Sequence, residues 1–259
     1  EAQTVMMDVN IAAQPDAAEL LMDYAHISTA RDLPTIDLHL DLNILTPTPG
    51  EVQQLLIQGL PSGFSLSHGT LSGNTWIVNA ADVPSLAITG YGTANQFDLS
   101  LETRATLDGA SDSGATQTLH IDLTPAGASN TANASGDGLL TGGSGADRFV
   151  FLQDDMGSIL KPARDVISDF KTAEGDKVDL ISVVASKPHA TGAELDSIID
   201  VFETGGTTTF KIKLDGNNVT QEISLQGVSK DSLYGASSLG ISEAAFLQKL
   251  IDDQVLIQQ

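Results

Sequence analysis

The sequence predicts a mainly β protein in which a β-sandwich is followed by a short parallel β-roll with a few flanking helices. Residues 35–125 contain short stretches of alternating apolar residues separated by Gly, Pro and Asn, which is typical of an all-β sandwich. Residues 142–150 read GGSGADRFV and fit the nine-residue repeat of a parallel roll. Residues 127–138, GASNTANASGDG, predict a linker. At 259 residues we expect two domains, 1–126 and 127–259.

The first domain is predicted to begin with a strand and a helix. Alternation from Val5 to Ile11 indicates the strand, and Pro15 lies near the start of the helix. Its apolar face would hold Ala17, Leu20, Leu21 and Tyr24. Further strands are predicted at residues 35–43, 52–57, 76–77, 86–88, 97–101, 103–107 and 119–123.

The glycine-rich motif at residues 142–150 also predicts a calcium site. Its glycines allow backbone angles that other residues resist, so carbonyl groups can converge on one point, and Asp147 adds a carboxylate. These are hard oxygen ligands, which calcium binds at roughly 2.3–2.6 Å. Phe149 occupies the large apolar position and is expected to face the interior of the roll.

The repeat spacing extends this site. Two nine-residue units form one coil, so counting 18 residues from Asp147 predicts that Asp165 stacks above it, with Ile167 as the apolar residue. Counting back nine residues gives Gly138, with Leu140 at the apolar position, and the opposite edge falls beside Asp154 and Asp155. We therefore expect about two coils. The candidate calcium ligands are Gly136, Gly138, Gly143, Gly145, Asp147, Asp154, Asp155, Asp165, Asp176 and Asp179.

The C-terminal region is predicted to contain a short helix, a hairpin and a capped helix. The short helix lies within residues 187–202, and residues 207–214 and 219–225 alternate as the two hairpin strands. Asp215 lies in the turn between them, and we expect it to be a turn residue rather than a calcium ligand. Ser242 is expected to cap a helix. Residues 255–257 predict a final strand, and the same tail could be read by a transporter.

Composition narrows the classes of partner. Lys and Arg total 12 against 34 Asp and Glu, which gives a formal charge of −22. A chain this acidic repels nucleic acid and anionic membrane surfaces, so neither is expected as a partner. The charge favours divalent cations, although solubility alone would also explain it. The chain has no cysteine, and its five histidines show no ligand spacing, so we expect surface or strand histidines rather than zinc ligands. No membrane span and no N-terminal signal peptide are predicted, and we expect the chain to be part of a longer protein.

Two stretches resemble known bacterial proteins. Residues 136–184, with GGSGADRFVF, DVISDF and GDKVDLISVV, resemble an RTX (repeats-in-toxin) region, and residues 209–229 and 242–259 are similar to the C-terminal target domain of type I secretion. GLPSGFSL and GTLSGNTW, within residues 35–125, resemble the immunoglobulin-like repeats of giant RTX adhesins.

The resemblance implies a secreted, cell-surface segment of a calcium-binding adhesin that supports adhesion or biofilm formation. Its expected partners are calcium ions and the ABC transporter, adaptor and outer-membrane channel of type I export, with a host or surface ligand bound through other parts of the parent protein. Low cytosolic calcium would leave the acidic roll unfolded for export, and extracellular calcium would then fold it.

No enzyme is expected, because the H-E-x-x-H, G-x-S-x-G and P-loop motifs are absent. Two alternatives remain open: the non-catalytic tail of a type I-secreted hydrolase or toxin, and a peptide- or sugar-binding module. Aromatic residues make up only 5% of the chain, and Trp76 is expected in the core, which disfavours the binding module.

Overall fold

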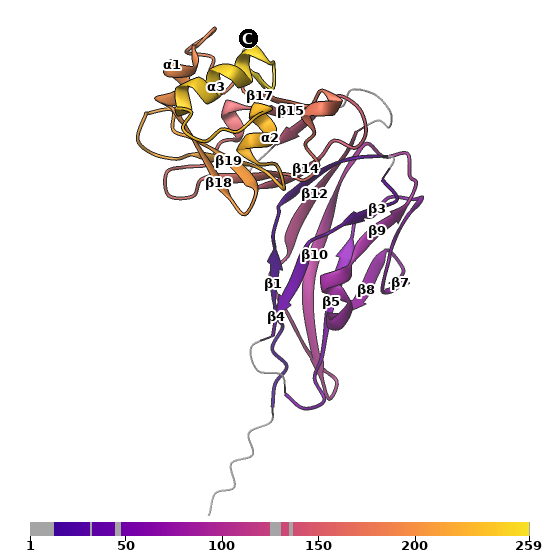
Figure 1. The fold of residues 1–259 in the computed structure, drawn as a ribbon. Helices are drawn as coiled ribbons and strands as arrows, with labels where there is room; N and C mark the ends of the chain where they lie inside the picture. The colour runs from indigo at the N-terminus through magenta and orange to yellow at the C-terminus, as the bar shows by residue number, and fades with distance from the viewer. Residues whose placement is uncertain (1–12, 32, 45–47, 125–130, 135–136, 259) are drawn as a thin grey trace, which may run out of the picture.

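The computed structural model describes residues 13–31, 33–44, 48–124, 131–134 and 137–258, with no side-chain description for 131–134 and 155. The chain is mainly β, as predicted, and its strands form several sheets. Figure 1 shows an elongated half, coloured indigo to magenta, with an orange and yellow half at one end. We call residues 13–124 the antiparallel half and residues 131–258 the parallel half, after their dominant strand pairing. The predicted strand at residues 5–11 lies outside the described residues.

The antiparallel half contains a large sheet and a small sheet around one apolar core. In the 12-residue strand β10 (Gln96–Leu107), buried and partly exposed residues alternate, which places Leu99, Leu101 and Ala105 inside. Strands β5 (Val52–Gln58), β11 (Ala110–Ser113) and β12 (Gln117–Thr124) pair with β10, and β8 (Thr75–Asn79) and β7 (Thr70–Ser72) follow β5 toward the edge of the large sheet. The small sheet has the order β3 (Thr35–Asp37), β9 (Ala87–Gly90), β6 (Phe64–Leu66), and the 3-10 turn η1 spans Ala80–Ser85.

Two local predictions near the N-terminus are wrong. The expected helix is a strand instead, β1 (Glu19–Met22), which pairs antiparallel with β4 (Leu40–Asn43). Leu20 is buried and Leu21 is exposed, which is the alternation of a strand. The apolar residues form this strand because β4 supplies its hydrogen-bonding partners. The strand expected over residues 35–43 divides at His39, whose φ of +52° turns the chain, so that β3 and β4 join different sheets.

One strand that was not predicted joins the two halves. Strand β2 (His26–Ala30) pairs in parallel with β12 on one side and with β14 (Gly138–Thr141) on the other, and all five of its residues are buried. A single 12-stranded sheet therefore passes through both halves. The linker predicted at residues 127–138 contains strand β13 (Thr131–Ala134) and the start of β14. The domain boundary at residue 126 stays a prediction.

The parallel half has a core between two parallel ladders. One ladder comprises β14, β16 (Ala163–Ile167) and β20 (Gln221–Leu225) of the large sheet. The other comprises β13, β15 (Arg148–Phe151), β17 (Lys177–Asp179) and β21 (Leu256–Ile257). Leu140, Phe149 and Ile167 are fully buried in this core, which confirms the interior positions assigned to them from the repeat.

The C-terminal elements extend both ladders. Strand β19 (Thr207–Ile212) forms the predicted hairpin with β20 and also pairs with β18 (Ile199–Thr204). Ser242 caps α3 (Glu243–Asp252) as predicted, by accepting a hydrogen bond from the Ala245 N–H. The final strand β21 pairs in parallel with β17, which confirms a docked terminal strand. The short elements are α1 (Gly192–Asp196), α2 (Lys230–Tyr234), η2 (Gln153–Asp155) and η3 (Thr172–Glu174). The helices in the described part of the chain are too short or too polar to cross a membrane.

Candidate metal centre

The glycine-rich motif forms one edge of the parallel half. Residues 142–147 connect β14 to β15, and residues 168–176 connect β16 to β17. Because β14 pairs with β16 and β15 pairs with β17, these two loops stack on each other, one coil apart. We call them together the acidic edge. The residues that contribute its polar contacts, through the backbone for the glycines, are Gly142, Gly143, Gly145, Asp147, Asp169, Lys171, Glu174 and Asp176.

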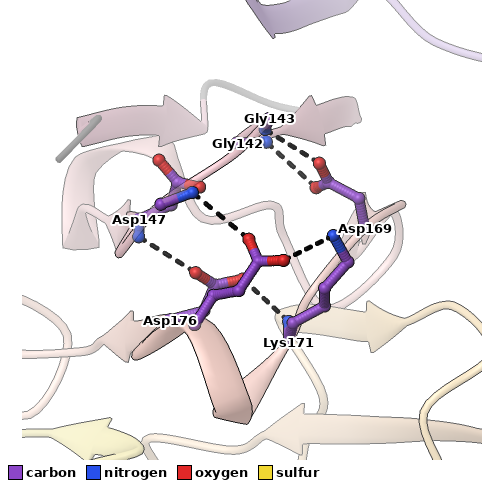
Figure 2. Close-up of polar contacts among 8 residues, drawn as sticks. Gly142, Gly143, Asp147, Asp169, Lys171 and Asp176 are labelled. Carbon is purple, nitrogen blue, oxygen red and sulfur yellow. Dashed lines mark hydrogen bonds and ion pairs between the residues drawn. The ribbon is translucent and has the colours of Figure 1, made fainter. Parts of the chain in front are cut away.

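Carboxylates of the second loop accept hydrogen bonds from the backbone N–H groups of the first. The two oxygens of Asp169 accept from Gly142 and Gly143, at 3.0 and 2.8 Å, as Figure 2 shows. Glu174 accepts from Gly145 at 3.2 Å, and Asp176 accepts from Asp147 at 3.0 Å. Gly143 and Gly145 have φ values of +89° and +116°, which strongly favour glycine. The glycines therefore turn a run of N–H donors toward the acids of the next coil.

Two acids of this edge are buried near each other. Asp147 and Asp176 are 2% and 3% exposed. Burial raises the pKa of Asp176, and the charges of Asp147 and Asp169 raise it further, although the N–H groups of Asp147 and Lys171 lower it by hydrogen bonding. A Cβ on Gly142 would lie 2.4 Å from Oδ2 of Asp147, so only glycine leaves room for this carboxylate. The edge thus concentrates negative charge where solvation is weak.

Lys171 supplies the cationic side chain of the acidic edge. Its Nζ lies 2.8 Å from Oε1 of Glu174. The pKa of Lys171 is raised, first by this hydrogen bond and also by the charges of Glu174, Asp169 and Asp176. The same contact lowers the pKa of Glu174. Lys171 therefore partly neutralises the edge and would compete with a bound cation for the same acids.

The donor chemistry of the acidic edge fits calcium. Asp147, Asp169, Glu174 and Asp176 offer carboxylates, and the glycine loop adds backbone carbonyls. The carboxylates do not converge, however. Among the described residues, a group of three His, Asp or Glu with all ligand atoms within 4.8 Å occurs only at His26, His120 and Asp122. Calcium binding at the edge would therefore require Asp169 and Asp176 to turn from their N–H partners.

The prediction that Asp165 stacks on Asp147 is wrong. Asp165 lies in β16 opposite Gly138, is 1% exposed, and accepts a hydrogen bond from Nε2 of Gln221. The coil is longer than two nine-residue units: 165 − 138 = 27 on one ladder, and 176 − 147 = 29 between the stacked acids. Residues 152–162, an excursion between β15 and β16, account for most of the difference. The acid stacked one coil from Asp147 is Asp176, which was itself a candidate.

The other candidate ligands that the structure describes lie away from this edge. Asp154 is exposed on the excursion, and Asp155 lies in the same turn, so neither forms an opposite edge with Gly138. Asp179 pairs with the guanidinium of Arg148, whose Nε lies 2.6 Å from its Oδ2. Gly138 lies in the ladder, and Gly136 falls outside the described residues. Gly143, Gly145, Asp147 and Asp176 are brought together, and their role as calcium ligands stays a prediction.

Sequence reasoning missed Asp169 and Glu174 as parts of this edge. Asp169 lies 169 − 142 = 27 residues after its partner Gly142, which matches the coil length on the β14–β16 ladder. Counting by 27 would have found it. The nine-residue motif gave no reason to choose that period, because only one complete copy of the motif is present.

Asp215 is a turn residue, as the sequence favoured. Its Oδ1 accepts hydrogen bonds from the N–H groups of Asn217 and Asn218, at 2.9 and 2.8 Å. These bonds, that of Asn218 first, lower the pKa of Asp215 from 3.8 to about 2. Its contribution to stability is therefore present above the ordinary pKa and is lost as the pH falls through about 2.

We expect the destabilisation caused by Asp215→Ala to shrink as the pH falls from 4 toward 2, because protonation removes the same acceptor in the native protein. Urea unfolding of both proteins across that range measures the difference in unfolding free energy. Asp154→Ala, which changes an exposed acid, is the control. A difference that stays constant with pH would contradict this role of the Asp215 carboxylate.

The likeness of this chain to known proteins is distant. No family model matches it, and no curated protein matches it. One solved structure with a detectable likeness is the AlgE6R3 subunit of the Azotobacter vinelandii mannuronan C5-epimerase. It is 24% identical over 48% of this chain and 68% of that chain, with a TM-score of 0.30. A likeness this distant assigns neither fold nor function, so the proposal below depends on the residues of this chain.

Proposed function

We propose that this chain is a calcium-responsive module of an RTX-type exported protein, in which the acidic edge binds calcium and thereby stabilises the parallel half. The observation that carries the proposal is the pair of buried acids, Asp147 and Asp176, stacked one coil apart on a glycine turn. Their side-chain donors are oxygens alone, which is the ligand type that calcium selects. Burial, and to a lesser extent the charges of Asp147 and Asp169, raise the pKa of Asp176, and a divalent cation there would offset both effects.

In fold terms, we propose an immunoglobulin-like sandwich in the antiparallel half and a short parallel β-roll in the other. The antiparallel ladders of β5, β10 and β12 around an apolar core support the sandwich. The parallel pairing of β14 with β16 and of β15 with β17, with apolar side chains between the ladders, supports the roll.

The biological role is proposed from the sequence resemblance and from charge. A chain with a formal charge of −22 repels itself when cations are scarce, which favours an extended form able to pass a type I export channel. Extracellular modules that bind calcium weakly, at about 10⁻⁴–10⁻³ M, would fill only outside the cell. We propose a secreted, cell-surface location and a part in adhesion, because a sandwich beside a roll matches the adhesin resemblance.

The test is unfolding of the full chain with calcium and with chelator. At calcium tenfold above its Kd, a single site adds about 1.4 kcal/mol to the unfolding free energy. Asp147→Asn and Asp176→Asn should each reduce this gain, because each replaces an anionic ligand with a neutral amide. Lys171→Gln should enlarge it, because the competing ammonium is removed. Calorimetric titration of the same variants measures the affinity directly.

The matched control is Asp154→Asn, which removes one negative charge from an exposed site away from the acidic edge. It should leave the calcium response unchanged. Equal unfolding with calcium and with chelator in the unsubstituted chain would overturn the proposal. A calcium response that Asp147→Asn and Asp176→Asn leave intact would place the ion elsewhere in the molecule and remove the acidic edge as its site.

A further inference from the structure

A polar row crosses the sheet where the two halves join. In the strand register, Asp98 of β10 lies opposite His120 of β12, and His120 lies opposite His26 of β2. The row continues across the sheet to Gly138 and Asp165 of the parallel half. Residues in register point to the same face, and Asp165 shares its face with the core residue Ile167. The outward face of the antiparallel half therefore continues as the core face of the parallel half.

His26, His120 and Asp122 meet at this seam. Nε2 of His26 lies 3.0 Å from Oδ2 of Asp122, and Nε2 of His120 lies 3.3 Å from Oδ1 of the same carboxylate. The ligand atoms of the three residues all lie within 4.8 Å of one another. His26 is buried, whereas the side chains of His120 and Asp122 are 39% and 30% exposed, so solvent reaches one side of the cluster.

Asp98 orients one of these imidazoles. Its Oδ1 lies 2.5 Å from Nδ1 of His120. A proton held on Nδ1 by this contact leaves Nε2 of the neutral imidazole as a lone-pair donor. That nitrogen faces a carboxylate oxygen of Asp122, so two acceptors point at one place. Histidines that bind a metal through one ring nitrogen commonly donate the N–H of the other ring nitrogen to a carboxylate.

We propose that His26, His120 and Asp122 form a second cation site, selective for a borderline transition-metal ion such as Zn²⁺, which fastens β2 to β12 at the seam of the two halves. In tetrahedral zinc sites with ligand distances of about 2.0–2.2 Å, ligand atoms lie roughly 3.4 Å apart. The 3.0 and 3.3 Å separations found here are close to that spacing. Two nitrogen donors select against calcium, which takes oxygen, so this site differs in kind from the acidic edge.

The open side of the cluster leaves room for water as a further ligand, because His120 and Asp122 are both partly exposed. The expected role is structural. Strand β2 pairs with β14 of the parallel half, so a metal bound to His26 and to two residues of β12 would fix within the antiparallel half the strand to which the parallel half is attached. The competing arrangement is a proton in place of the metal, with His120 as an imidazolium between Asp98 and Asp122.

The experiment uses the full chain in excess calcium, so that the acidic edge does not affect the outcome. Co²⁺ is added as the probe, because a low-coordinate site with nitrogen donors absorbs visible light more strongly than aqueous Co²⁺. Zn²⁺ should displace it, and calorimetry with Zn²⁺ gives the affinity. We expect Asp98→Asn, which keeps all three ligands, to weaken Zn²⁺ binding by about 10- to 100-fold. His120→Gln, which removes a ligand, should weaken it more.

His68→Gln is the matched control, because His68 is exposed and lies outside the cluster. It should bind Zn²⁺ like the unsubstituted chain. His26→Gln is avoided as the main test, because His26 is buried and its loss could unfold the chain. The proposal is overturned if no Co²⁺ spectrum develops, which would indicate the protonated arrangement, or if His120→Gln and His68→Gln bind Zn²⁺ equally.

Discussion

Phe149→Ala should lower the unfolding free energy by about 3–5 kcal/mol. Phe149 is fully buried between the two ladders of the parallel half, and its ring lies 6.0 Å from that of Phe170. Truncation removes the transfer energy of the ring and leaves a cavity that the surrounding strands cannot close, because both ladders are fixed by backbone hydrogen bonds. Urea denaturation followed by circular dichroism measures the loss.

The control for this prediction is Phe202→Ala. Phe202 is 50% exposed on β18, where its ring lies under the ammonium of Lys211. Removing it should cost much less than removing Phe149, because little buried area is lost. If both variants unfolded at the same urea concentration, the core between the ladders would not be the main source of stability in this half.

Gly192→Ala should destabilise the chain by about 1–3 kcal/mol or more, although alanine is the better helix former. Gly192 begins α1, where it packs against α3. A Cβ there would lie 2.1 Å from the carbonyl oxygen of Ala244 and 2.5 Å from the backbone N of Gln248. Both neighbours are backbone atoms, so neither can rotate away. The Gly192 N–H also donates to the side chain of Gln248 at 2.8 Å, and that bond would be disturbed.

Ala193→Val tests the explanation, because it adds volume to the adjacent, exposed position of the same helix. It should cost only the small helix-propensity difference of a β-branched residue, well under 1 kcal/mol. Thermal unfolding of both variants, with the unsubstituted chain as reference, gives the comparison. A Gly192→Ala protein that was as stable as Ala193→Val would show that α1 can move away from α3 without loss.

The interior of the parallel half could be predicted because it depends on local pattern. Leu140, Phe149 and Ile167 occupy the positions that alternation and the glycine repeat assigned to the core. Local pattern also predicted the hairpin strands, the turn at Asp215 and the cap at Ser242, since each depends on residues close together in the chain.

The candidate sites were only partly predictable, because they depend on pairing between distant strands. The motif identified Asp147, but the length of the coil decided that Asp176, and not Asp165, lies next to it. Histidines 94 positions apart (120 − 26 = 94) meet only because β2 inserts beside β12. The helix predicted near Leu20 became a strand for the same reason, since β4 offered a hydrogen-bonding partner.

The sequence by itself determined a mainly β, strongly acidic chain with a glycine turn that presents Asp147 and with apolar residues spaced for a layered core. Only the tertiary structure decided which acids share an edge with Asp147. It also decided that one sheet passes through both halves and places His26 beside His120. The physical reason is that an apolar pattern fixes which face of a strand is buried, whereas the choice of neighbouring strand is made by backbone hydrogen bonds, which every sequence can form.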